Sequence, residues 1–314
     1  DCAWTITLAE AGGGPTVFSY TTSNLGPTDT EAVLFNFNGS AGVDYVLTFD
    51  DGGGIGLDTR RGAIDNLSFN QVALGPKVSA SGGTWDNSNT WTPTGEPDNT
   101  IDAHIGGGHI VTVNSSSPPN EVANLSVGHN MSPNPGNGIL IVDAGGNLVI
   151  NEALSIGDAA NASGVVTVNT GGTLTVNGNT TTIDSAVAPD FGTLNVNGGV
   201  FTEAGNLIIG DANTGIVNVT NNGTATVDGN TVFGNSGGTG TLNVNTGGVF
   251  SFKSDIFTNG GSGTINLDDG TLAFSHTTNT HEFIQPGVNI ILSGAGGTIE
   301  VGPGAGVVGR IAGN

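Results

Sequence analysis

A unit of 23 to 28 residues is repeated along this chain. The phrase GTLNVNGGVF at 192–201 returns almost unchanged as GTLNVNTGGVF at 240–250. Similar units open at Gly138, Gly164, Gly192, Gly215, Gly240, Gly263 and Gly287. Apolar and polar residues alternate within each unit, as in Leu242-Asn243-Val244, which is typical of strands with one buried face. A unit of this length holds three short strands and three turns, so the repeat predicts a solenoid with one coil per unit.

Stacked coils should place equivalent residues in ladders about 4.8 Å apart. The predicted inward ladder is aliphatic and consists of Leu140, Val166, Leu194, Val217, Leu242 and Ile265. The residue that closes the first strand is Asp143, Asn169, Asn197, Thr220, Asn245 or Asp268, and such side chains bond the backbone in turns and one another between coils. We predict a right-handed parallel β-helix of about eight coils, whose looser first coil has strands at 110–113 and 125–127, and essentially no α-helix.

Composition narrows the possible partners. The 314 residues carry a formal net charge of −22, and the five basic residues form no cluster in the sequence. Nucleic acids and anionic membrane surfaces are therefore poor partners. No apolar run reaches the roughly 20 residues that span a bilayer, so we expect no membrane span. The 36% of hydrophobic residues is too high for a disordered acidic tail.

The first 76 residues do not follow the coil pattern. Strands can be assigned at 3–9, 16–21, 32–38, 43–49 and 62–74, with longer loops between them. Five strands are fewer than the eight of a jelly roll, which predicts a small antiparallel, jelly-roll-like and incomplete β-sandwich. The alternative is a compact small sandwich that needs no partner. The chain is thus all-β, with a sandwich at 1–76, a linker and solenoid cap at 77–100, and a β-helix at 101–314.

Two segments resemble parts of known bacterial families. GGTWDNSNTWTPTGEPDNTIDAHI at 82–105 resembles the entry segment of autotransporter-like surface proteins built from coil repeats. GAIDNLSF at 62–69 resembles the final strand of jelly rolls in exported proteins of the PEP-CTERM type. These resemblances imply an extracellular or cell-surface location, with a signal peptide already removed.

The two ends of the solenoid differ in sequence. Trp85 and Trp91 lie before the first coil, where large aromatic side chains can cover the open core, although they could instead stack on sugars. The coil pattern continues through 290–292, 299–301 and 307–311 with no distinct closing segment. We therefore expect copies to associate head to tail into a filament, with the open coil of one copy completing the sandwich of the next. Cys2, the single cysteine, predicts a partner elsewhere or a free thiol.

A calcium site is the one metal site that the residues favour. Asp50, Asp51, Asp58 and Asp65 crowd the edge of the predicted sandwich, and carboxylate oxygens suit Ca²⁺. The jelly rolls of the resembled type sometimes hold a structural calcium there. The histidines His104, His109, His129, His276 and His281 complete no zinc spacing, so we interpret them as solvated loop residues. No other cofactor is expected.

Polysaccharide-active enzymes must be weighed, because β-helices include lyases and hydrolases that act on polysaccharides. Asp158 and Asp211 follow the third strand in equivalent positions two coils apart, with Asn235 nearly aligned in the next coil. Asp268 and Asp269 form another acidic pair at a corner, and a turn role is sufficient for all four carboxylates. We therefore predict no catalytic residues and a structural or adhesive extracellular protein that polymerises or binds surface polysaccharide. An enzyme acting on polysaccharide and a carbohydrate-binding module remain the alternatives.

Overall fold

The chain forms two compact units, Asp1–Val72 and Ala73–Asn314. The computed structural model describes residues 5–10, 16–21, 45–50, 75–114, 118–129, 136–159, 162–184, 191–275, 284–294 and 296–301. These residues are almost entirely β-strands and turns, and the 3-10 turn η1 (Ser88–Thr90) is the one helical segment among them. No helix in the described ranges is long and apolar enough to cross a membrane.

The first unit contains a small antiparallel sheet in the order β2-β1-β3. Its strands are β1 (Thr5–Glu10), β2 (Thr16–Thr21) and β3 (Tyr45–Asp50). Leu8 of β1 is paired with Phe18 on one side and Leu47 on the other, and its side chain is buried. These strands match three of the five predicted ones. The predicted strands at 32–38 and 62–74 lie outside the described residues, so the second sheet of the sandwich stays a prediction.

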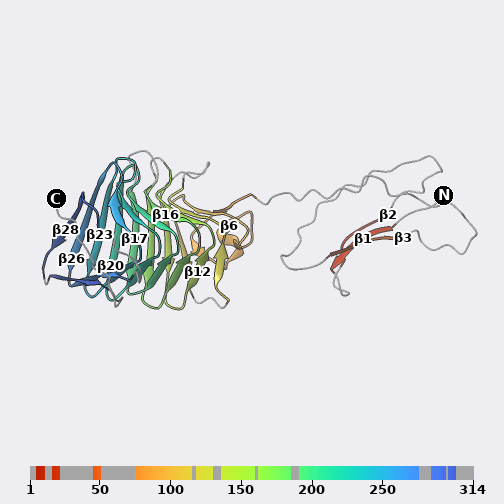
Figure 1. The fold of residues 1–314 in the computed structure, drawn as a ribbon. Helices are drawn as coiled ribbons and strands as arrows, with labels where there is room; N and C mark the ends of the chain where they lie inside the picture. The colour runs from red at the N-terminus through yellow and green to blue at the C-terminus, as the bar shows by residue number, and fades with distance from the viewer. Residues whose placement is uncertain are drawn as a thin grey trace, which may run out of the picture. The chain divides into compact units, whose positions relative to one another are not determined.

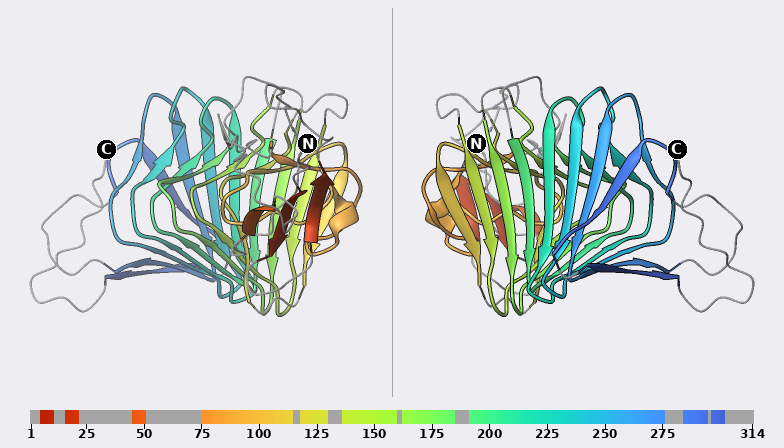
Figure 2. Two further views of the ribbon diagram at one scale, coloured as in Figure 1. Left: turned by 90° about the vertical axis from the view of Figure 1, so that its right-hand side faces the viewer. Right: turned by 90° about the vertical axis from the view of Figure 1, so that its left-hand side faces the viewer.

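The second unit is a parallel β-solenoid of about eight turns, which the repeat predicted (Figure 1). Each complete coil contributes one strand to each of three sheets, and both views of Figure 2 show successive coils side by side. Sheet 1 consists of β5 (Gly83–Thr84), β8 (His109–Val113), β11 (Gly138–Val142), β14 (Gly164–Asn169), β17 (Phe191–Asn197), β20 (Thr214–Thr220), β23 (Thr239–Asn245), β26 (Ser262–Asp268) and β28 (Val288–Leu292).

The other two sheets follow the same coil order. Sheet 2 consists of β9 (Asn120–Val122), β12 (Asn147–Ile150), β15 (Thr173–Val176), β18 (Val200–Glu203), β21 (Thr224–Val227), β24 (Val249–Phe252), β27 (Gly270–Phe274) and β29 (Gly297–Val301). Sheet 3 consists of β6 (Trp91–Thr92), β4 (Lys77–Ser79), β7 (Ala103–Ile105), β10 (Leu125–Val127), β13 (Ala153–Ile156), β16 (Thr180–Ile183), β19 (Asn206–Ile209), β22 (Thr231–Phe233) and β25 (Ile256–Thr258).

The repeated glycines set the register of sheet 1. The first six predicted unit-opening glycines are paired with one another from coil to coil, from Gly138 to Gly263. A Cβ at Gly192 would lie 2.5 Å from the Asp184 backbone nitrogen, so glycine is required where the third strand of one coil passes the first strand of the next. The last predicted unit is shifted by one residue, because Gly263 is paired with Val288 and not with Gly287.

The core lies inside the coils and is a set of ladders. The predicted inward ladder from Leu140 to Ile265 is fully buried. In sheet 2 a neighbouring ladder places Ala225 between Phe201 and Phe250. A small residue between two large ones keeps the volume of the core constant from coil to coil, as close packing requires.

A closed cap covers the first coil. Trp85 and Trp91 are each 1% exposed, and their rings meet edge to face with centroids 5.0 Å apart. The Trp91 indole donates a 2.8 Å hydrogen bond to the Trp85 carbonyl, and β6 pairs antiparallel with β4, which ends the parallel order of sheet 3. The buried Lys77 ammonium donates to the carbonyls of Pro93 and Thr94, 3.1 Å each. The capping interpretation of the tryptophans is confirmed, and stacking on a sugar is wrong because neither ring is accessible.

The opposite end of the described solenoid is open. Leu292 and Ile299 occupy inward ladder positions, because they are paired with Leu267 and Leu272 of the preceding coil. They are nevertheless 59% and 40% exposed, whereas Leu267 and Leu272 are fully buried. The core therefore has one covered end and one end where apolar side chains meet solvent.

Candidate functional site

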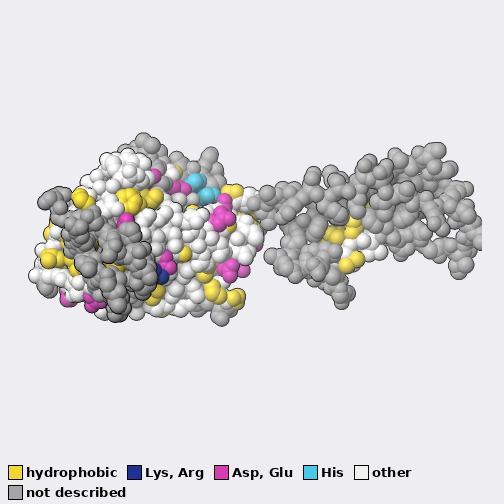
Figure 3. Space-filling model, in the orientation of Figure 1, with side chains coloured by type: hydrophobic (Ala, Val, Ile, Leu, Met, Phe, Trp, Pro, Cys, Tyr) yellow, Lys and Arg dark blue, Asp and Glu magenta, His cyan; other side chains and the backbone are white. Residues whose placement is uncertain are grey.

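Two histidines and an aspartate meet on the outside of the first coils. His104 projects from the outer face of β7, and His129 and Asp158 follow β10 and β13 at equivalent corner positions. Each corner is formed by a glycine in the left-handed region, Gly128 with φ 80° and Gly157 with φ 70°. The two glycines turn the chain alike, so consecutive coils bring the corner side chains together. Figure 3 shows histidine side chains next to acidic ones on the solenoid surface.

The corner pair forms a histidine–carboxylate dyad. His129 Nδ1 lies 2.8 Å and 3.0 Å from the two carboxylate oxygens of Asp158. The side chains are 27% and 14% exposed, so the pair is partly shielded from water. A carboxylate at Nδ1 favours the tautomer with its proton on that nitrogen, which leaves Nε2 as the acceptor. In this arrangement His129 can accept a proton at Nε2 while Asp158 stabilises the resulting charge.

His104 completes the cluster as a neutral neighbour. Its ring stacks on that of His129 with centroids 4.2 Å apart and planes 19° from parallel. Burial, and then the positive charge available on His129, lower the pKa of His104. Its Nδ1 is buried with no hydrogen-bond partner in the described part of the chain. The neutral form of the His104 ring is therefore favoured in the folded protein.

Three of the five histidines are described, and His129 lies in a loop as predicted, at the corner after β10. The prediction of solvated loop residues is wrong for His104 and His109. Both lie on strands, and His109 Nδ1 is 2.9 Å from the Ser79 carbonyl oxygen, within the cap. His276 and His281 lie outside the described residues. Spacing alone could not reveal the cluster, because His104, His129 and Asp158 belong to three successive coils and coils vary in length.

The other predicted carboxylates take structural roles. Asp211 accepts hydrogen bonds from Asn235 (2.8 Å) and Ser236 (2.7 Å), and Asn235 in turn accepts one from Asn259 (2.7 Å). Asp158 and Asp211 thus bind different partners. Asp269 adopts a positive φ of 59°, as its predicted corner position requires.

The residues of the predicted calcium site lie almost entirely outside the described part of the chain. Asp51, Asp58 and Asp65 lie outside the described residues, and only the backbone of Asp50, at the end of β3, is described. Within the described ranges, no group of three or more His, Cys, Asp or Glu side chains is arranged to hold a metal ion. The calcium site stays a prediction.

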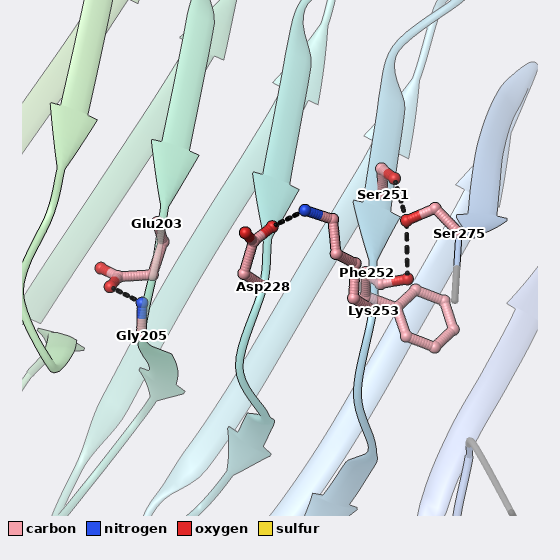
Figure 4. A network of polar contacts seen from close by, with 7 residues as sticks. All are labelled: Glu203, Gly205, Asp228, Ser251, Phe252, Lys253 and Ser275. Atoms are coloured by element: carbon pink, nitrogen blue, oxygen red, sulfur yellow. Dashed lines mark hydrogen bonds and ion pairs between the residues drawn. The ribbon is translucent and has the colours of Figure 1, made fainter. Parts of the chain in front are cut away.

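Sequence reasoning missed a second ionisable group, Glu203, inside the core. Glu203 occupies an inward ladder position between Val176 and Val227 and is fully buried. Its carboxyl group accepts a hydrogen bond from the Thr181 hydroxyl at Oε2 and one of 2.7 Å from the Gly205 amide at Oε1. Figure 4 shows the contact with Gly205. Burial raises the pKa of Glu203 to about 7, and the two hydrogen bonds only partly oppose this shift.

A nearby ion pair on the surface contrasts with Glu203. Lys253 Nζ lies 2.5 Å from Asp228 Oδ1, and the two side chains are 44% and 39% exposed (Figure 4). An exposed pair of this kind contributes little to stability. The signal that could have identified Glu203 is the ladder itself, because a glutamate stands where adjacent units carry valine.

No family model, no curated protein and no solved structure matches this chain.

Proposed function

We propose that this chain is a structural element of a bacterial cell surface or extracellular matrix. The observation that supports it most is the unbroken register of about eight coils, with aliphatic ladders inside and bonded amide ladders outside. Repeated short-range contacts of this kind make a stiff, extended body whose shape does not depend on a ligand. The resemblance to autotransporter-like and PEP-CTERM-type proteins agrees with a location outside the cell.

We further propose that copies associate end to end through the open coil. Leu292 and Ile299 offer apolar side chains at that end, and β28 and β29 each pair on one side only among the described strands. The sheet of the first unit carries exposed Val17 and Val46, and its outer strands β2 and β3 likewise pair on one side only in the described part. Strand addition between such edges forms open fibres when the contact does not close on itself.

Light scattering and electron microscopy of the purified chain test this assembly. We expect species larger than the 31.1 kDa monomer, and we expect Leu292→Asp to shift them towards monomer by placing a charge in the contact. Thr193→Asp, which adds the same charge on the outward face of β17, should leave assembly unchanged. A monodisperse monomer at all accessible concentrations would contradict end-to-end association and leave the structural role to be tested separately.

The dyad of His129 and Asp158 favours a second candidate function, acid–base chemistry on a polysaccharide. An imidazole oriented by a carboxylate can remove a proton from a sugar ring or a bound water. Incubation with uronate and neutral oligosaccharides, followed by product analysis, tests this function. Turnover that is lost in His129→Asn and kept in His109→Asn would favour the enzyme, and absence of any product would favour the structural role.

A further inference from the structure

Sheet 2 carries an outward face of regularly spaced hydroxyl and methyl groups. The outward side chains of β15, β18 and β21 are Thr173, Thr175, Val200, Thr202, Thr224 and Thr226, which we call the threonine face. They form two columns in register across the coils. One column consists of Thr173, Val200 and Thr224, and the other of Thr175, Thr202 and Thr226. The strand β24 continues both columns with a valine and a serine.

The face is uncharged although the molecule is strongly acidic. From β12 to β27 the outward positions of sheet 2 hold only Asn, Thr, Val, Ser and Ala, whereas the whole chain has a net charge of −22. Most of the solenoid surface in Figure 3 likewise carries neither charged nor apolar side chains. An uncharged face complements a ligand without charge, and it offers nothing to a cation, a phosphate or a uronate.

The hydroxyls of the threonine face are free to bind a ligand. Within the described residues, those of Thr175, Thr202 and Thr226 have no hydrogen-bond partner in the protein. Sheet 1 differs, because its outward asparagines bind each other: Asn243 donates to Asn218 and accepts from Asn266, 2.7 Å each. Each free hydroxyl offers one donor and two acceptor sites. The threonine face therefore needs hydrogen-bond partners from outside the protein.

The spacing of the face specifies what kind of partner fits. Adjacent coils lie about 4.8 Å apart and alternate residues of a strand about 6.6 Å apart. Within the described residues the hydroxyls of Thr175, Thr202 and Thr226 do not bond one another, so an external partner can bridge them. β-Branched side chains have restricted χ1 rotamers, so the array is rigid before any ligand binds. Sugar-binding faces use aromatic rings for stacking, and the outward positions from β12 to β27 hold none.

We propose that the threonine face binds an ordered lattice of water, that is, the surface of an ice crystal. A two-dimensional array with these spacings is close to the arrangement of oxygen atoms on a prism face of ice. The hydroxyls bond lattice waters directly, and the methyl groups of threonine and valine fill the spaces between them. A rigid array loses little conformational entropy when it meets a lattice, which allows many weak contacts to add up. The proposal does not depend on end-to-end association.

The full chain is tested for thermal hysteresis and for inhibition of ice recrystallisation, with serum albumin as a negative control. We expect activity in the parent protein and its loss in Thr202→Tyr, because a protruding ring separates the face from the crystal. Thr241→Tyr, the same change on the outward face of β23, should keep full activity. Thermal unfolding of each variant establishes that it is folded.

Two further variants, each with one added lysine, test the proposal if Thr202→Tyr does not fold. Thr226→Lys should abolish activity, whereas Thr264→Lys on the outward face of β26 should not. Absence of hysteresis and of recrystallisation inhibition in the parent chain overturns the proposal. Equal loss in the variants of both sheets also overturns it, as does binding to crystalline cellulose without any effect on ice, which would assign the face to a polysaccharide.

Discussion

At the scale of single residues, Glu203 is the position where the chain departs most from its own pattern. A glutamate in an apolar ladder is tolerated because Thr181 and the Gly205 amide hydrogen-bond to both oxygens of its carboxyl group. Thr181 itself occupies an inward ladder position between Leu154 and Leu207. The two polar residues in apolar ladders, Thr181 and Glu203, therefore lie in neighbouring ladders, and each satisfies the other's hydrogen bond. A buried polar group is costly only when its partners are missing.

This arrangement predicts a stability that falls as pH rises. Because the pKa of Glu203 is raised from 4.5 to about 7, the folded state keeps its proton while the unfolded state loses it between these values. The stabilisation is complete below pH 4.5 and is lost through pH 7, an effect of about 3 kcal/mol. Glu203→Gln should remove this dependence and exceed the parent in stability at pH 8, as measured by urea unfolding at several pH values.

The exposed Glu96 provides the matched control for this prediction. Glu96→Gln should leave the pH profile of the unfolding free energy unchanged, because this side chain is exposed on the cap. A Glu203→Gln variant that follows the parent curve at every pH would show that Glu203 ionises normally in the folded protein.

At the scale of elements, amide ladders hold the outer corners and faces of sheet 1. Asn195, Asn218, Asn243 and Asn266 form a continuous chain of side-chain hydrogen bonds across four coils. A second ladder, in which Asn169 donates to Asp143 at 2.8 Å, follows the predicted corner residues. Each ladder bond lies along the solenoid axis and therefore reinforces the pairing of strands between coils.

Breaking the asparagine ladder should destabilise the fold by more than the higher strand propensity of a replacement residue stabilises it. Asn243→Thr removes two side-chain hydrogen bonds and introduces a residue that strands prefer, so we expect a net loss of about 1 kcal/mol. Asn289→Thr on β28 makes the same exchange at a side chain that takes no part in the ladder and should not destabilise. Chemical denaturation of both variants measures the difference, and equal effects would show that the ladder bonds contribute nothing.

At the scale of the whole solenoid, the two ends are not equivalent. The first coil is closed by buried Trp85 and Trp91, whereas the last described coil exposes Leu292 and Ile299. In a stack held by nearest-neighbour contacts, the covered end protects the coil beneath it from fraying.

Truncation of side chains at the two ends should therefore have unequal effects. Trp91→Ala leaves a cavity over the first coil and should cost about 3–5 kcal/mol, whereas Leu292→Ala removes an exposed side chain and should cost much less. Thermal unfolding monitored by circular dichroism measures both. Similar losses in the two variants would contradict the assignment of a closed and an open end.

Much of the fold follows from the sequence, because one turn chemistry is repeated in every coil. Unit-opening glycines, corner amides and alternating strands fix the register of one coil on the next, and the paired positions from Gly138 to Gly263 follow them. The single displaced unit, at Gly287, lies where the pattern weakens. Local periodicity was sufficient here because each coil contacts mainly its neighbours.

The sequence by itself determined the strands, the coil length and the inward ladders, since these depend on residues a few positions apart. Only the tertiary structure decided which polar residues of different coils meet: Asp158 with His129, His104 against His129, and Thr181 with Glu203. Coils and their loops vary in length, so a contact across 22 to 29 positions cannot be counted along the chain. Contacts of this kind depend on the three-dimensional stacking of corners and sheets, and the candidate site consists of them.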